Sequence, residues 1–440
     1  MSNKFDGIKL DENGRLIPTA YDKIKTFENG KTPVNYIYVG LDGNDLNPGT
    51  YDKPFATFDK ALSVITPGTS LLVKPGVYAG AIRAANLYAT EENPIWIGGI
   101  PNEERPVLDG DKAGLSVIKG AYIIIHDLEI SNIMASPTAT GMQIHDAGDI
   151  ADWPRTVHHF VFRNLYVHHI NYQQFKFSCL NHYWLFDCEI SHDGNGQSAG
   201  IDTVGGVGGG VIAYNYFHDF VGVAIQHKGN SFDTDIFGNL FVNIKAQAIN
   251  AGQCTGTPYF RPMLVQDGTV YEGSDLRIYS NIFIETMGPV AFWSSTDCYF
   301  VNNTVINPTN YLLRILPSDI TTLANHGFPY NNTVANNIFY YDNPREAFNV
   351  SLNNAGIQTC VIKNNLFHST TNPGKFPDKT EIFPLFIDNI TADPLFSDEN
   401  YALKPNSPAA SGGVKFDFVK EDYYGRPVSD NPSLGAVQLN

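Results

Sequence analysis

Polar side chains of the kinds that bind and cleave sugars recur at even spacing between residues 200 and 254. Asp202, Gln226 and Asn250 stand 24 residues apart, and each follows an isoleucine. Lys228 lies two residues beyond Gln226, so an extended strand directs both side chains to the same face. An acid, two amides and an amine on one surface can hydrogen-bond hydroxyls and bind a carboxylate. This stretch therefore predicts a glycan-binding or glycan-cleaving site.

Asp202, Gln226 and Asn250 form a predicted row, one residue from each coil. Strand alternation in neighbouring coils adds further residues to this row. Taking Ile201, Ile225, Ile249 and Phe292 as inward-facing adds Trp293 to the row, and the preceding coils add Gln143, His145 and Lys176. An indole can stack on a sugar ring while amides hold its hydroxyls. The predicted substrate-binding residues are therefore Gln226, Asn250, Trp293, Gln143 and His145.

Charged residues outside the row complete the candidate set. Arg261, in a long insertion, and Arg314, in a later coil, are candidate cations for a sugar carboxylate. Glu272 stands near the end of the same insertion and is a candidate second acid. His227 points inward by strand alternation, which fits a hydrogen-bonded core histidine, with a catalytic role as the alternative.

Two reactions fit these residues. In β-elimination, a base removes the C5 proton of a uronic acid while a cation neutralises its carboxylate, and Lys228 is the candidate base. In hydrolysis, two carboxylates flank the bond, and Asp202 with either Glu272 or Asp146 is the candidate pair. We favour elimination slightly. A third alternative is a non-catalytic glycan-binding module in which Asp202 and Lys228 form only an ion pair.

The element that must position these residues is a short repeat. An Asn or Asp followed by apolar or aromatic residues recurs at Asp127, Asn164, Asp187, Asn215, Asn239, Asn281, Asn303, Asn337 and Asn365. Neighbouring copies lie 22 to 42 residues apart, which is typical of a solenoid. The repeats contain β-branched and aromatic strands with Asn turns, and stacked Asn side chains can form a ladder. The sequence thus predicts an all-β, right-handed parallel β-helix.

Three regions follow from this pattern. Residues 1–34 form a polar leader, residues 35–390 the parallel β-helix, and residues 391–440 a turn-rich C-terminal closure. Apolar spacing between Pro54 and Ile65 predicts a short helix that caps the first coil. The longest insertions, after Gln253 and after Pro317, are expected to shape a site on one face.

Composition narrows the class of protein. The 440 residues carry a formal charge of −16, which excludes nucleic acid as the main partner because phosphate binding needs a basic stripe. No apolar run approaches the ~18 residues that span a bilayer. The N-terminal residues lack the basic and then apolar pattern of a secretory signal peptide. We therefore expect neither a membrane span nor a signal peptide in this chain.

Specific segments also resemble a known group. The stretch YIYVGLDGNDLNPGTYDKPFATFDKAL resembles the start of bacterial extracellular β-helix proteins related to polysaccharide lyases, and LKPNSPAASGG, YYGRP and LGAVQ are similar to their endings. The resemblance implies an acidic polysaccharide as substrate and an extracellular location, either secreted or on a virion. Similarity to tailspike depolymerases implies a homotrimer.

The lysine at position 228 is similar to one that chondroitinase B and alginate lyases carry at a strand end before an Asn-aromatic turn. Their arginine one coil later corresponds to a position near Asn250. Their acidic calcium ligands correspond to Val221 and Val223, which cannot bind a cation through their side chains. The resemblance thus raises calcium as a cofactor without supplying its ligands, and the sequence assigns no metal ligand.

Overall fold

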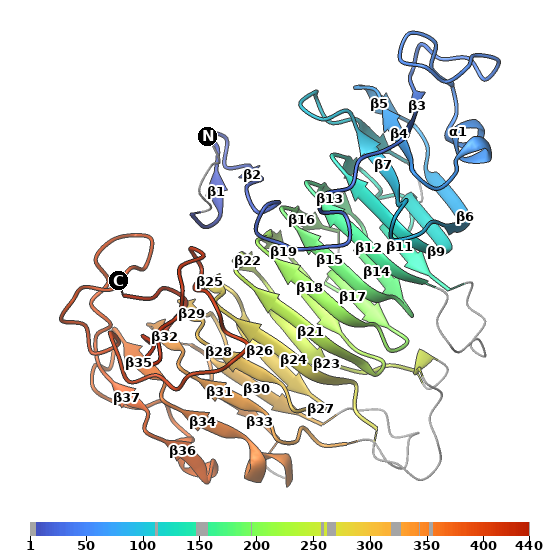
Figure 1. Cartoon of the computed structure of the whole chain (residues 1–440). Helices are drawn as coiled ribbons and strands as arrows, with labels where there is room; N and C mark the ends of the chain where they lie inside the picture. The colour runs from blue at the N-terminus through green and yellow to red at the C-terminus, as the bar shows by residue number, and fades with distance from the viewer. Residues whose placement is uncertain are drawn as a thin grey trace.

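The computed structural model describes residues 6–110, 113–146, 157–194, 196–256, 259–261, 270–317, 327–342, 344–351 and 355–439. Over most of its length the chain winds into a parallel β-helix, as the repeat predicts (Figure 1). Each complete coil contributes one strand to each of three sheets, and each strand pairs with its equivalents in the coils before and after.

The first sheet carries the residues discussed above. Its strands are β6 (Ile82–Tyr88), the first half of β9 (Ala113–His126), β11 (Thr140–His145), β14 (Gln173–Ser178), β17 (Ala199–Val204), β20 (Val223–His227), β23 (Gln247–Gly252), β26 (Gly288–Trp293), β30 (Leu313–Leu316) and β33 (Phe348–Val350).

The second sheet follows the first around each coil. Its strands are β3 (Asn35–Val39), β4 (Thr69–Val73), β7 (Ile95–Gly99), the second half of β9, β12 (Val157–Arg163), β15 (Asn181–Phe186), β18 (Gly208–Ala213), β21 (Ser231–Phe237), β24 (Gly273–Tyr279), β27 (Ser295–Thr296), β28 (Tyr299–Val301), β31 (Thr333–Ala335), β34 (Val361–Lys363) and β36 (Leu385–Ile387).

The third sheet closes the coil. Its strands are β5 (Val77–Tyr78), β8 (Val107–Asp109), β10 (Glu129–Ser131), β13 (Tyr166–Ile170), β16 (Glu189–Asp193), β19 (Tyr216–Phe220), β22 (Leu240–Ile244), β25 (Ile282–Ile284), β29 (Thr304–Ile306), β32 (Ile338–Tyr341), β35 (Leu366–Ser369) and β37 (Ile390–Thr391). Two short 3-10 helices, Ala355–Thr359 and Thr380–Ile382, lie among the last coils.

Stacked side chains fill the interior between the sheets. The rings of Phe217, Phe241 and Phe283 stack on successive coils with centroids 4.8 and 4.7 Å apart. These three side chains are completely buried. Each coil therefore buries its apolar face only against its neighbours, which is the property that makes a solenoid stable as a stack.

A ladder of buried asparagines marks the turn between the second and third sheets. The side-chain oxygen of Asn215 accepts a hydrogen bond from the backbone N–H of Cys188. In each later member the side-chain oxygen accepts hydrogen bonds from the backbone and side-chain N–H of the preceding asparagine, and these members are Asn239, Asn281, Asn303, Asn337, Asn365 and Asn389. The amides thereby satisfy backbone groups that the turn would otherwise leave unpaired in the interior. The predicted Asn ladder is confirmed from Asn215 onward.

The earlier repeat residues lie one position away from this ladder. Because Arg163, Phe186 and Ala213 pair in register, Asn164 and Asp187 stand beside Tyr214 and not beside Asn215. All three occupy the left-handed backbone region, with φ of 52°, 53° and 56°. Asn and Asp tolerate this conformation well, which explains their presence at this position. At the next position, where the ladder stands, Asn is used for its side-chain hydrogen bonds.

The predicted capping helix is present as α1 (Phe58–Val64). Its N-cap Thr57 accepts a hydrogen bond from the backbone N–H of Lys60 at 3.1 Å. Ala61 is completely buried and Phe58 packs against the interior of the first coils. The helix thus covers apolar side chains at the start of the stack, where the next coil is missing.

The leader runs along the outside of the solenoid and packs against it (Figure 1). It begins with a hairpin of β1 (Lys9–Leu10) and β2 (Leu16–Ile17). Beyond the hairpin, Ala20 and Ile24 pack on outward side chains of the second sheet. The carboxylate of Glu28 accepts hydrogen bonds from Trp96 and Arg163. The leader therefore contacts several coils in succession.

The C-terminal region, which is rich in turns as predicted, packs against the flank of the later coils (Figure 1). Val419 is buried against Tyr279 and Val301 of the second sheet. Leu434 is buried against Ile338 of the third sheet. The C-terminal region also contacts the leader, since Lys23 forms an ion pair with Glu421 at 2.5 Å.

Candidate active site

Strand register places the predicted row on the first sheet. Equivalent positions of successive strands are occupied, in order, by Gln143, Lys176, Asp202, Gln226, Asn250, Ala291, Arg314 and Asn349. Adjacent strands lie about 4.8 Å apart, so neighbouring side chains in this row are within contact distance. The sequence prediction of one shared row is confirmed for Gln143, Asp202, Gln226 and Asn250.

Trp293 is displaced from the predicted position. Val290, and not Phe292, pairs with Ile249, so Trp293 pairs with Gly252, two residues farther along the strand. The Arg314 guanidinium lies 5.7 Å from the Trp293 ring centre and donates a hydrogen bond to Asn349 at 2.8 Å. Trp293 and Arg314 therefore form a separate group several coils from Asp202.

A pocket of about 480 Å³ lies at the other end of the row. It opens where β11, β14, β17 and β20 end and beside the first part of the insertion after β23. Its lining residues are Gln143, His145, Asp146, Tyr172, Gln173, Lys176, Ser178, Cys179, Asp202, Val204, Gly205, Lys228, Cys254, Thr255, Gly256, Tyr259 and Arg261. Gln143, His145, Asp202, Lys228 and Arg261 are thus brought together, whereas Gln226 and Asn250 lie outside the lining.

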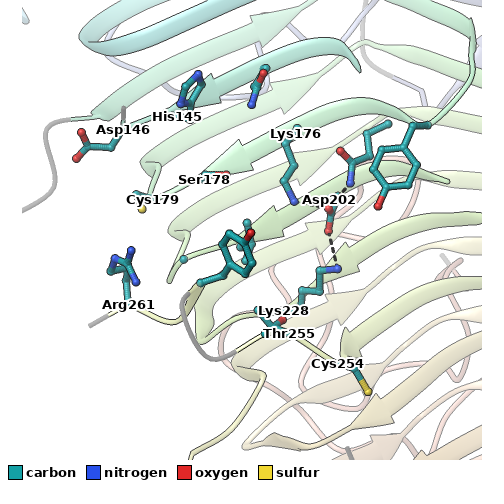
Figure 2. Close-up of a pocket in the computed structure, with 17 residues that line it drawn as sticks. His145, Asp146, Lys176, Ser178, Cys179, Asp202, Lys228, Cys254, Thr255 and Arg261 are labelled. Atoms are coloured by element: carbon teal, nitrogen blue, oxygen red, sulfur yellow. Dashed lines mark hydrogen bonds and ion pairs between the residues drawn. The ribbon is translucent and has the colours of Figure 1, made fainter. Parts of the chain in front are cut away.

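The charge arrangement in the pocket centres on Asp202. Its side chain is only 1% exposed, and it forms ion pairs with Lys176 through Oδ2 and with Lys228 through Oδ1, the latter at 3.5 Å (Figure 2). Gln173 also donates a hydrogen bond to Oδ2 at 2.5 Å. One buried carboxylate therefore contacts the amino groups of two lysines from neighbouring strands.

Lys176 is the lysine whose protonation the pocket changes. Burial lowers its pKa below the ordinary value, Asp202 opposes this effect, and the neighbouring Lys228 lowers the pKa further. A lysine with a lowered pKa supplies a neutral amine more readily near neutral pH. Strand counting placed Lys176 on the row but gave it no role, because only the fold shows that it shares Asp202 with Lys228.

The opposite side of the pocket carries a second set of polar groups. Figure 2 shows Arg261 and Asp146 on one side of the pocket, facing the side that holds Lys176, Asp202 and Lys228. Arg261 is 6% exposed and donates a hydrogen bond to the carbonyl oxygen of Phe260 at 2.5 Å. Burial lowers the pKa of His145, and Asp146 opposes that shift.

Among the lining residues without an assigned role in the sequence, four carry polar groups that can contact a sugar. These are Tyr172, Gln173, Ser178 and Tyr259. Gln173 precedes the row by three residues, and Tyr259 lies in the insertion, so neither shares the even spacing that identified the row. Tyrosines, amides and a hydroxyl are groups that sugar-binding pockets use to orient hydroxyls.

Two candidate catalytic residues occupy structural positions. Glu272 is completely buried outside the pocket lining, and its carboxylate accepts backbone hydrogen bonds from Gly229 at 2.8 Å and Thr255 at 2.7 Å. Glu272 therefore holds the start of the insertion, at Thr255, against the coil that contains Gly229. His227 is also completely buried, and its ring nitrogens lie 2.6 and 2.9 Å from the hydroxyls of Thr203 and Thr234. Burial lowers its pKa to about 3, as expected for a neutral core histidine.

No protein-family model matches the chain. In a stretch of 142 residues it is 29% identical to the Bacillus subtilis (strain 168) protein described as "Uncharacterized protein YwoF". That stretch covers 30% of this chain and 30% of the relative, so the comparison spans less than a third of either protein.

Solved structures share the architecture. A structure described as a glycoside hydrolase matches with a TM-score of 0.54 at 9% identity, over 81% of this chain and 99% of its own. The structure of XylC in complex with xylose matches with a TM-score of 0.53 at 11% identity, over 92% and 98% of the two chains. The expected resemblance to β-helix proteins is therefore confirmed for the fold. In the described residues, no helix has the length and apolar character needed to cross a bilayer.

Proposed function

We propose that this chain degrades an acidic polysaccharide and that the pocket beside Asp202 is where the glycan is cleaved. The observation that carries the proposal is the buried Asp202 carboxylate shared by two lysines, with Arg261 across the same pocket. Lys228 and Arg261 are then two cations on opposite sides of the pocket that can bind the carboxylate of an anionic chain on an otherwise acidic protein. An acidic polysaccharide as substrate agrees with the proposal that the protein acts outside the cell.

The reaction that this arrangement supports best is β-elimination from a uronic acid. A base takes the proton from C5, the C4–C5 double bond forms, and the C4–O4 bond breaks. The oxygen that leaves takes up a proton, for which the phenols of Tyr172 and Tyr259 are the candidate donors in the lining. A cation on the sugar carboxylate stabilises the charge that develops during proton removal.

The two lysines divide these tasks. Lys176 has the lowered pKa and is the better source of a neutral amine, so we assign it as the base. Lys228 and Arg261 then bind the sugar carboxylate. The sequence favoured Lys228 as the base, and that assignment is the alternative within the same pocket.

Hydrolysis is the second candidate because two acids, Asp146 and Asp202, both line the pocket. Their backbones are two strands and three residues apart, which puts the Cα atoms roughly 14 Å from each other. The carboxylates of glycosidases stand about 5 to 9.5 Å apart, so Asp146 and Asp202 could act as a pair only with both side chains directed toward each other. Asp202 is also bound by two lysines, which opposes a role as proton donor. This geometry favours elimination.

The test is incubation of the protein with uronate-containing polysaccharides while two products are followed. Elimination gives both new reducing ends and the ultraviolet absorbance of an unsaturated uronate. New reducing ends without that absorbance contradict elimination and indicate hydrolysis. Binding without either product indicates a glycan-binding module. The variant Asp202→Asn is expected to lose cleavage, whereas Lys245→Ala, an exposed lysine outside the pocket lining, is the matched control.

A further inference from the structure

Three potential metal ligands converge on the third sheet, away from the pocket on the first sheet. They are His192, at the end of β16, and His218 and Asp219, in β19. One ligand atom from each residue lies within 4.8 Å of the other two. Nothing in the proposed reaction uses these residues.

The coil geometry brings the three residues together. Ser191 pairs with His218, so the next residue of each strand, His192 and Asp219, stand side by side at the turn. Both have left-handed backbones, with φ of 52° and 56°. Their side chains are 42% and 43% exposed, so an ion in solution can reach them.

Each ligand is oriented by a partner on its other polar atom. His192 Nδ1 lies 2.8 Å from the Ser191 hydroxyl, and His218 Nε2 lies 3.3 Å from Glu189 Oε1. The Asn243 amide donates to Asp219 Oδ1 at 2.5 Å. Metal-binding histidines and carboxylates are usually held in this way by outer hydrogen bonds. The atoms left facing one another are His192 Nε2, His218 Nδ1 and Asp219 Oδ2.

The remaining contacts also fit a bound cation. Asp219 Oδ2 lies 2.8 Å from His218 Nδ1 and 3.9 Å from His192 Nε2. Both nitrogens of His218 lie near a carboxylate oxygen, Nδ1 near Asp219 and Nε2 near Glu189. With a metal on Nδ1, Nε2–H can donate to Glu189 while Nδ1 and Asp219 Oδ2 both bind the ion.

We propose that His192, His218 and Asp219 form a binding site for a divalent transition metal, with zinc as the ion that fits best. Two imidazole nitrogens and one carboxylate oxygen are ligands that zinc accepts at about 2.0 to 2.2 Å, with a fourth position open to water. Calcium and magnesium prefer oxygen ligands, which two histidines do not supply. The site joins two successive coils and is independent of the proposed cleavage reaction.

The site is also connected to the leader. Glu189, which orients His218, accepts hydrogen bonds from the side chain of Arg15 at 3.1 Å and from the backbone N–H of Leu16 at 2.8 Å. A metal that fixes His218 therefore also fixes Glu189 and the contact between leader and coil. Zinc is expected to raise the melting temperature of the whole chain as well as to bind.

The experiment is calorimetric titration of untagged, chelator-treated protein with zinc and, separately, with calcium. His192→Asn and Asp219→Asn are the test variants, because Asn suits the left-handed backbone but lacks the imidazole nitrogen of His192 and the negative charge of Asp219. Glu285→Asn is the matched control, since Glu285 occupies the same turn position two coils after Asp219 with φ of 52°. Melting temperature with and without zinc is measured on all four proteins.

The expected result is one equivalent of zinc that wild type and Glu285→Asn bind and that both test variants lack. Zinc then raises the melting temperature of the first pair only, and calcium has no effect. Asn243→Gly, which removes the partner of Asp219, is expected to weaken zinc binding by about 10- to 100-fold. Wild-type zinc binding in both test variants, no zinc binding by wild type, or loss of binding in the control would each overturn the proposal.

Discussion

Replacing each lysine of the pocket by arginine separates the base from the carboxylate-binding cation. Arginine keeps the positive charge that balances Asp202 but does not give up its proton at working pH. Lys176→Arg is therefore expected to abolish proton removal. Lys228→Arg is expected to retain it, because a cation that binds a carboxylate can be a guanidinium.

The size of the effect follows from the role assigned to each lysine. Loss of a general base lowers kcat by about 10²- to 10⁴-fold, which is about 3 to 5 kcal/mol in activation free energy. Lys228→Arg should keep kcat within about tenfold and mainly change KM. Alanine is the poorer replacement at position 176, because Asp202 is 1% exposed and removing a partner of a buried ion pair costs up to about 3 to 5 kcal/mol of stability.

The assay is the initial rate of unsaturated-uronate formation against substrate concentration and pH, with melting temperature as the check on folding. The neutral amine is the active form, so wild-type kcat/KM should rise with pH through the lowered pKa of Lys176. Wild-type kcat in Lys176→Arg together with loss of activity in Lys228→Arg would refute the assignment and identify Lys228 as the base. Wild-type kinetics in both variants would remove the lysine pair from the mechanism.

Two further predictions concern stability. Asn281→Ala removes the hydrogen-bond partners of the Asn239 backbone N–H, the Asn239 side-chain N–H and the Ile236 carbonyl, which are buried in the ladder. The free energy of unfolding measured by urea denaturation should therefore fall by roughly 3 to 6 kcal/mol. A fall of less than about 1 kcal/mol would contradict the importance of the ladder. Burial raises the pKa of Asp187 to about 6, so the folded chain binds this proton more tightly than the unfolded chain does. The contribution of Asp187 is largest below about pH 4 and is lost as the pH rises through 6, by roughly 3 kcal/mol. Asp187→Asn should remove that part of the pH dependence of unfolding, and an unchanged slope between pH 4 and 6 would speak against it.

The sequence predicted the fold and the shared row of Asp202, Gln226 and Asn250 because the repeat is regular there. A period of 24 residues aligns Asp202, Gln226 and Asn250 directly, and alternation then gives the face of each strand. Alternation fixes the face but not the position along the strand. After the long insertion, Ala291 and Trp293 both fit the outward face, and only the register shows that Ala291 continues the row.

Some roles depend on contacts that the spacing of residues along the chain does not show. Glu272 stands in the insertion, where nothing in its spacing showed that its carboxylate would bind backbone N–H groups of Gly229 and Thr255. The role of Lys176 depends on a shared ion partner, which is a three-dimensional relation between adjacent coils. The metal site depends on hydrogen bonds across three coils, which residue types alone did not reveal.

The path of the leader has a mechanical consequence for the whole molecule. An ordinary solenoid can fray from either end, because each coil holds only its neighbours. Here one strap of chain is fastened to Trp96 near one end, to Asp187 in the middle and, through Lys23, to Glu421 of the returning terminus. Local unfolding of the coils at either end must first break the contacts of that strap, so the coils are expected to unfold in one cooperative transition. Removing residues 1–34 should convert this transition into stepwise loss of coils.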